Sequence, residues 1–337
     1  MLHLFNATLQ GLPRALHEAD VTIAEPSDID DEYLTQTEVR PCLPGRTKIH
    51  RFVSTCRLAR ILSRVIDVLY TQNKRKQASS KIDQMHRLCC EHLLDQLDFS
   101  FEEVPDDLPD PNSEEPADLA VVASFANEQL LYHYIRWLIH RPGLSFEVAE
   151  PQFSTCLQIA TEAASAILRT ADTYQRTLSY NELSPAGHPI TIFVASLTPI
   201  YRTVLGKANR TTQYPLGRSA EEDRQACRHG LDALTSETYD KADQVRRIQL
   251  HQIMAKVFGD MPALTDGLEV SHGSQAEQNT SQQQNPQHIA HPSLDYCEQE
   301  LEHFTTHEDL RNFVHDAFSP GWNDEAFGAA HNFGNGF

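Results

Sequence analysis

The stretch LLYHYIRWLIHRPGL at residues 130–144 decides the fold of this chain. It closes a longer segment, 117–141, that is apolar on nearly every side of a helix. A helix of this kind is stable only where other helices surround it, so we expect it in the middle of a bundle. We expect it to end near His140-Arg141-Pro142-Gly143, because proline lacks an amide donor and disfavours helix at the residue before it.

A second helix is predicted upstream, from about residue 49 to the end of RLARILSRVIDVLY at 57–70. Its apolar side chains recur at the spacing of one helical face, namely Leu58, Ile61, Leu62, Val65, Ile66 and Leu69. A neighbouring stripe carries Arg57, Arg60 and Arg64. We interpret this stripe as a solvated face rather than a track for phosphates.

Further helices are predicted at about 79–98, 150–179, 189–207 and 220–259. The helix at 150–179 carries Cys156 and several alanines, whose small side chains permit close contact between helix axes. The helical pattern at 220–259 is weak near its middle, so this segment forms either one helix or two. No segment alternates with period two, so the predicted fold class is all-α, a multi-helix bundle.

Composition divides the chain into four parts. Residues 1–48 read as an extended connector, because prolines and the acidic run at 28–32 oppose a helix. Residues 49–262 form the predicted helical domain. Residues 263–293 are rich in Ser, Gln, Asn and His, typical of a low-complexity linker. Residues 294–337 form a tail in which aromatic side chains alternate with acidic ones.

The bulk properties of the chain restrict its partners and its compartment. A formal net charge of −19 over 337 residues disfavours direct binding to a nucleic-acid backbone. The seven cysteines are irregularly spaced without a CxxC pair, which favours a reducing compartment. No stretch approaches about 18 apolar residues without charge, so we expect no membrane-spanning helix and no membrane partner.

Motifs that carry chemistry are absent from the sequence, which contains no GxGxxG, GxxxxGK[ST], GxSxG or HExxH. The densest group of potential metal ligands is HRLCCEH at 86–92, and no second pair completes a zinc site. We interpret it as packed cysteines with partly exposed histidines. We therefore predict no catalytic, metal-binding or DNA-binding residues, no cofactor and no enzyme activity.

His133 and His140 share a helical face, but the nearby sequence supplies no obvious third ligand. We interpret His140 as a residue that satisfies backbone carbonyls at the end of its helix.

Five segments, in this order, resemble the fungal-specific transcription factor regulatory domain, also called the middle homology region, of the zinc binuclear cluster family. They are EADVTIAEPSDIDDEYLT at 18–35, RLARILSRVIDVLY at 57–70, LLYHYIRWLIHRPGL at 130–144, FSTCLQIATEAASAIL at 153–168 and CRHGLDAL at 227–234. The resemblance covers about residues 10–260. It implies a helical domain without catalytic residues, in which His140, Arg141, Pro142 and Cys156 are structural.

The six-cysteine zinc cluster of that family is not found in this sequence, nor are its basic linker and coiled coil. The resemblance therefore implies a transcription regulator in the nucleus that acts through co-regulator proteins or related transcription factors and reaches DNA only indirectly. Two alternatives stay open. In the first, the chain is a stand-alone interaction module that modulates full-length relatives. In the second, it is a helical domain that senses a small-molecule effector.

The acidic and aromatic tail is the predicted partner-binding segment. Its acidic residues oppose collapse and keep the rings available, foremost Phe313, Phe318, Trp322 and Phe327. The alternative is that residues 294–318 form a helix that packs back on the bundle.

Overall fold

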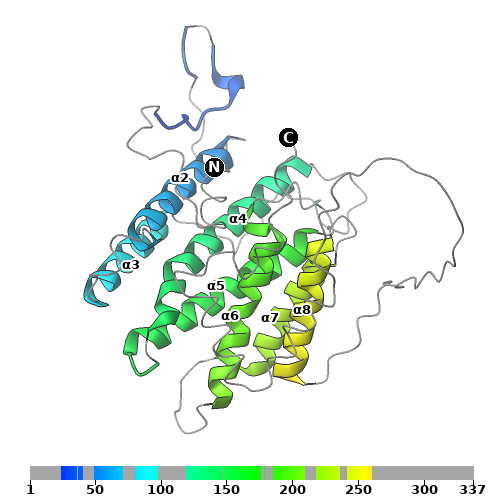
Figure 1. Cartoon of the computed structure of the whole chain (residues 1–337). Coiled ribbons are helices and arrows are strands. Elements are labelled where there is room, and N and C mark those ends of the chain that lie inside the picture. The colour runs from blue at the N-terminus through cyan, green and yellow to red at the C-terminus, as the bar shows by residue number, and fades with distance from the viewer. Residues whose placement is uncertain are drawn as a thin grey trace, which may run out of the picture.

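The computed structural model describes residues 24–35, 37–40, 49–70, 80–97, 119–146, 148–175, 178, 185–208, 218–235 and 241–259. Over these residues the chain is an all-α bundle (Figure 1), as the sequence predicts. The β pairing in this part of the chain is one isolated antiparallel bridge between Leu34 and Val39. The predicted linker and tail lie outside the described residues.

The elements follow the predicted order closely. The weak middle of 220–259 separates two helices, because α7 ends at Ala233 and α8 begins at Lys241. The elements are η2 (Asp31–Tyr33), α2 (His50–Val65), η3 (Ile66–Tyr70, a π-helical turn), α3 (Ser80–Asp95), α4 (Leu119–His140), η5 (Arg141–Ser145), α5 (Pro151–Gln175), η6 (Pro185–Gly187), α6 (Pro189–Ala208), α7 (Ala220–Ala233) and α8 (Lys241–Phe258).

The helices stack in a sequence of layers (Figure 1). α2 and α3 cover one side of α4, whose other side packs against α5. α5 in turn contacts α6 and α7, and α8 closes the opposite edge of the bundle against both. The apolar helix 117–141, observed as α4, therefore lies in the middle of the bundle, as predicted.

Proline and short-range capping set the helix boundaries. α4 ends at His140 because Pro142 follows, and the chain continues as the 3₁₀ turn η5. α5 and α6 each begin with a proline, which needs no amide partner in the first turn. At α7, Ser219 Oγ accepts a hydrogen bond from the Glu222 amide, while the Glu222 carboxylate accepts one from the Ser219 amide.

α6 is more apolar than we expected, because we predicted no segment long and apolar enough to span a membrane. Its segment Pro189–Lys207 has a mean hydropathy of 1.2 and is long enough to cross a membrane. However, 83% of this window is buried inside the bundle. The core helix of a helical bundle has the same length and composition, and the burial of α6 identifies it as such a helix.

Two glycines allow helices to approach closely. A Cβ atom on Gly143 would lie 2.4 Å from Cys156 Sγ, so η5 rests directly on the second turn of α5. A Cβ on Gly230 of α7 would lie 2.4 Å from Ser196 Oγ of α6. Between them, Ala160, Ala163 and Ala164 of α5 are at most 2% exposed, which confirms the predicted small-residue contact.

The contact at Gly143 predicts the effect of a single methyl group. We expect Gly143→Ala to lower the free energy of unfolding by roughly 1–3 kcal/mol, because the new Cβ overpacks the site against Cys156. The measurement is urea unfolding followed by far-UV circular dichroism.

Gly206→Ala is the matched control, because a Cβ at this exposed position of α6 meets nothing within 4 Å. It should raise the stability by about 0.5–1 kcal/mol through helix propensity alone. Equal effects of the two substitutions would contradict the close contact at Gly143.

Candidate functional site

The structure brings the family-motif residues together at the corner between α4 and α5. His140 ends α4, Arg141 and Pro142 begin η5, and Cys156 lies on α5 against Gly143. The Arg141 guanidinium stands over the Trp137 ring, 5.1 Å from its centroid. Cys156 is 4% exposed, and burial raises the pKa of its thiol, which disfavours the nucleophilic thiolate. These four residues therefore lie at one corner of the bundle, and their structural role stays a prediction.

The interpretation of His140 as a partner of backbone carbonyls is wrong. Its Nε2 lies 3.2 Å from Glu91 Oε2 of α3, and the side chain is 8% exposed. The physical reason is that α3 packs against the last turns of α4, which brings the Glu91 carboxylate to the His140 ring.

Glu91 has two partners on α4, Arg136 and His140. Arg136 Nε donates to Glu91 Oε1 at 3.0 Å, one helical turn before His140. Burial alone would raise the pKa of Glu91, but the hydrogen bond with His140 and the charges of His140 and Arg136 outweigh it and lower the pKa. The Glu91 carboxylate is thus held in its charged form and links α3 to α4 through these polar contacts.

The segment HRLCCEH divides between two faces of α3. Cys90 is 1% exposed, and burial raises the pKa of its thiol to about 11. Cys89 is exposed, so the interpretation as two packed cysteines is wrong for this residue, because neighbours in a helix point about 100° apart. Within the described residues no three His, Cys, Asp or Glu side chains lie where they could hold one metal ion.

His133 occupies a half-buried position on α4. Burial, with smaller contributions from the positive charges of Arg136 and Arg169, lowers the pKa of its imidazole to about 4. The ring is therefore neutral at physiological pH and packs edge-on against Tyr132, with 5.3 Å between the ring centroids.

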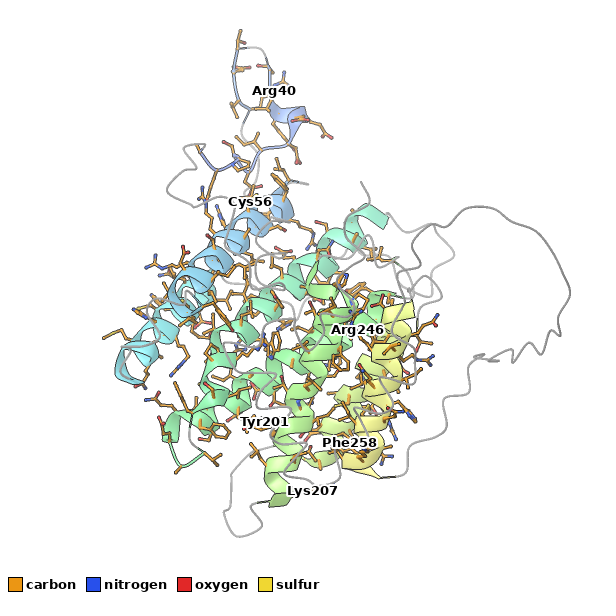
Figure 2. All side chains as sticks on the ribbon, viewed as in Figure 1. Arg40, Cys56, Tyr201, Lys207, Arg246 and Phe258 are labelled. Atoms are coloured by element: carbon orange, nitrogen blue, oxygen red, sulfur yellow. The ribbon has the colours of Figure 1, made fainter. Side chains whose placement is uncertain are left out.

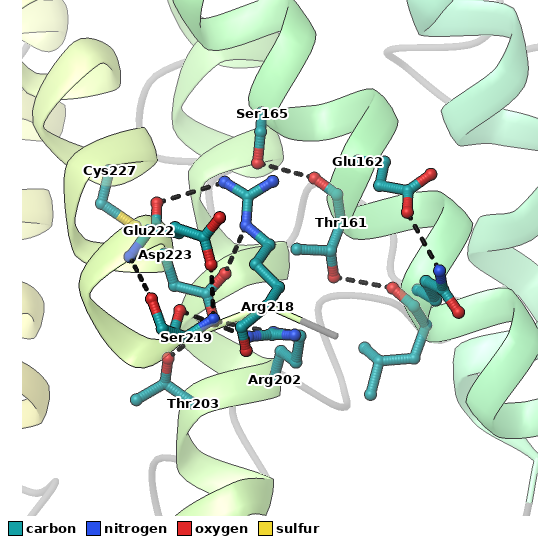
Figure 3. A network of polar contacts seen from close by, with 12 residues as sticks. Thr161, Glu162, Ser165, Arg202, Thr203, Arg218, Ser219, Glu222, Asp223 and Cys227 are labelled. Carbon is teal, nitrogen blue, oxygen red and sulfur yellow. Dashed lines mark hydrogen bonds and ion pairs between the residues drawn. The ribbon is translucent and has the colours of Figure 1, made fainter. Parts of the chain in front are cut away.

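The strongest buried charge cluster was not predicted from the sequence. It joins α6 to the start of α7 around Asp223, whose side chain is fully buried (Figure 3). Arg202 Nε donates to Asp223 Oδ2 at 2.7 Å, and Thr203 Oγ1 donates to the same oxygen at 3.1 Å. Arg218 Nε lies 3.1 Å from Asp223 Oδ1. Arg202 also donates to the backbone carbonyls of Arg218 and Ser219.

This cluster ties two helices and the loop end before α7 into one unit. Burial raises the pKa of Asp223, and the hydrogen bonds and charges of its arginine and threonine partners oppose that rise. The sequence held two signals that could have revealed it. Arg202 and Thr203 interrupt an otherwise apolar helix, and Ser219 with Glu222 has the spacing of a capping box.

A histidine and an aspartate also pair on the surface of the bundle. His229 Nδ1 of α7 lies 2.7 Å from Asp172 Oδ2 of α5. The other ring nitrogen faces the Gln225 amide at 3.4 Å rather than a hydroxyl or a thiol. The pair therefore ties α5 to α7.

The predicted partner-binding side chains, Phe313, Phe318, Trp322 and Phe327, lie outside the described residues. Their role stays a prediction.

Comparison with known proteins gives one informative similarity. The chain is 29% identical over 183 residues to the "Transcriptional activator protein acu-15" of Neurospora crassa. This stretch is 53% of the chain and 19% of the activator, so the chain matches about a fifth of that protein's length. No family model matches the sequence. No solved structure matches it either.

The buried cluster predicts a large loss of stability on truncation of Asp223. We expect Asp223→Ala to cost about 3–5 kcal/mol of unfolding free energy, because it leaves the buried Arg202 without its counter-charge. The comparison is Glu221→Ala, which removes a carboxylate that is 68% exposed and lies 3.9 Å from Arg224 and 4.0 Å from Arg228. Glu221→Ala should leave the denaturant midpoint nearly unchanged. A similar small shift for both variants would show that the cluster contributes little.

The environment of His133 predicts a pH dependence of stability. Its folded pKa lies below the usual 6.5, so below that pH the unfolded chain takes up a proton that the folded chain does not. Stability is therefore lost as pH falls from about 6.5 towards 4. Between pH 7 and 5 the loss from this residue should be roughly 1–2 kcal/mol, given its half-buried position.

His133→Gln should remove that part of the pH dependence. Unfolding free energies of the parent and the variant, measured in urea at pH 7 and pH 5, isolate the contribution. If the two chains lose the same stability on acidification, His133 is not the group responsible.

Proposed function

We propose that this chain is a non-enzymatic regulatory region of a transcription regulator, which acts in the nucleus through protein–protein contacts. The observation that carries the proposal is its similarity, 29% identity over 183 residues, to a fungal transcriptional activator. The five segments that resemble the regulatory domain of the zinc-cluster family point to the same class of protein. In this proposal DNA is reached through a separate DNA-binding module, since the sequence carries no zinc cluster and a net charge of −19.

The geometry of the bundle supports a regulatory rather than a chemical role. The buried thiols of Cys90 and Cys156 have raised pKa values, and the buried carboxylates Glu91 and Asp223 are engaged by arginine or histidine. These groups hold helices together. In the proposal, the surfaces of the helices and the tail provide the contacts with other proteins.

The tail is the proposed contact with the transcription machinery. Residues 294–337 contain seven Phe or Trp side chains in an acidic background with a single arginine, Arg311. Such a segment presents rings to an apolar groove while its charges keep it soluble. A helix over 301–318 that forms on docking would carry Leu310, Phe313, Val314 and Phe318 on one face.

Fusion of residues 294–337 to a foreign DNA-binding domain tests this function. We expect the fusion to activate a reporter gene. Replacing Phe313, Phe318, Trp322 and Phe327 together by Ala should abolish activation, since each ring contributes on the order of 1.5–3 kcal/mol when buried against a partner.

The matched control replaces four polar residues of the same segment, Asn312, Ser319, Asn323 and Asn332, by Ala. This variant keeps every ring and every charge, so it should remain active. A silent parent fusion, or equal activity of the aromatic variant, would show that the tail is solubilising or structural.

A further inference from the structure

The described part of the N-terminal connector is held against α2 by carboxylates. The Glu25 carboxylate bridges two arginines of the helix. Its Oε2 lies 3.5 Å from Arg57 Nε, and its Oε1 accepts a hydrogen bond from Arg60. Asp28 Oδ2 lies 2.9 Å from His50 Nδ1. The predicted solvated arginine stripe is thus exposed, but two of its members are engaged by the connector.

A third carboxylate reaches the N-terminal end of the same helix. Asp30 Oδ1 accepts a hydrogen bond at 3.1 Å from the amide of Ile49, the residue before α2. Since the N-terminal end of a helix carries a partial positive charge, a carboxylate is favourable there. Beyond Asp30 the chain leaves the helix, and the short hairpin that ends at Arg40 lies away from the bundle (Figure 2).

The connector and the helix run in opposite directions over the same length. Glu25 and Asp30 are five residues apart, which is up to about 16 Å in an extended chain. Their partners, Arg60 and Ile49, are eleven residues apart, which is also about 16 Å along a helix. The carboxylates therefore meet their partners in one register, and the contacts form together.

These contacts are polar and lie at the surface. The side chains of Arg57 and Arg60 remain 46% and 42% exposed, and that of His50 remains 39% exposed. Among the described residues from 24 to 40 none is buried. Exposed ion pairs contribute little stability and are screened by salt. The connector can therefore leave α2 while the bundle keeps its fold.

α2 favours an acidic ligand because it has no acidic side chain of its own. Its 16 residues include arginines at four positions and no Asp or Glu. Arg51 pairs with Glu128 of α4, whereas Arg57, Arg60 and Arg64 are exposed. The compensating charge for this face therefore comes from a segment outside the helix.

We infer that the first turns of α2 form a binding site for an extended acidic segment of a partner protein, and that the connector occupies this site when no partner is bound. The connector shows the chemistry of the ligand, with one carboxylate for the Arg57–Arg60 pair, one for His50 and one for the Ile49 amide. Connector and partner compete for the same groups. The inference rests on the proposed function and deepens it, because it names one class of protein segment that the bundle contacts.

Titration of a labelled peptide with the full chain tests this site. The probe is AEPSDIDDEY, residues 24–33, whose fluorescence anisotropy is followed at about 0.05 M salt. The release variant, Glu25→Gln with Asp28→Asn, frees the site, and we expect it to bind the probe with a Kd on the order of 0.1 mM. The parent chain should bind about tenfold more weakly, because a segment tethered in cis competes at an effective concentration of about 1 mM.

The control variant, Asp31→Asn with Glu38→Gln, removes the same charge from the connector at positions outside the three contacts with α2. It should bind the probe as weakly as the parent. Adding Arg57→Gln and Arg60→Gln to the release variant should raise the Kd by at least about tenfold. Circular dichroism checks that every variant keeps its helices.

Three results would overturn the inference: a release variant that does not bind the probe, a parent that binds it equally well, or binding that persists without both arginines. A release variant that binds a DNA duplex and not the peptide would also overturn it, because this face would then take a phosphate backbone. The reporter test uses the tail alone. A silent tail therefore leaves this site standing, and failure of peptide binding leaves the activity of the tail untouched.

Discussion

The missing side chain of Gly143 is the constraint on which the arrangement of the bundle depends. With no Cβ at this position, η5 rests on Cys156, and the chain turns from α4 into α5 within one short corner. That turn brings the two longest helices together along their length, and α5 then supplies the surface on which α6 and α7 pack. The alanines of α5 extend the same principle, because small side chains keep the helix axes close where three neighbours meet one helix.

Two kinds of contact hold the layers together, and they differ in what they specify. Between α4, α5 and α6 the contact is mainly apolar, with a buried hydrogen bond from Trp137 Nε1 to Thr198 Oγ1 at 3.0 Å. The contact of α6 with α7 also holds the buried pair of Arg202 with Asp223. Between α4 and the α2–α3 layer, ion pairs are prominent, as at Glu91 with Arg136 and Arg51 with Glu128. Ion pairs add little net stability, but a buried charge without its partner is costly. These pairs therefore determine how α2 and α3 are aligned along α4 more than they contribute to the free energy of unfolding.

The sequence predicts this fold well where one local rule decides the outcome. The end of α4 follows from Pro142, and the burial of α4 follows from its apolar surface, so neither needed tertiary information. The partner of His140 depends on which carboxylate α3 places there, and the cluster around Asp223 depends on the contact of α6 with the start of α7. Long-range pairings of this kind leave only weak local signals, such as an arginine inside an apolar helix. For the same reason the anchoring of the connector by Glu25 was missed, although its acidic run was evident.

The distribution of charge is the reason why we place the proposed protein contacts at the edges of the bundle and not in its core. The buried carboxylates and thiols are committed to partners or held protonated by burial, and a group that stabilises a helix contact cannot change its charge without weakening that contact. The edge formed by the connector, α2 and α3 is different, because its exposed apolar side chains stand beside charges of both signs that contribute little to the core. Substitutions there can alter partner binding while the bundle keeps its fold, and that separation is what a regulatory surface on a stable helical scaffold requires.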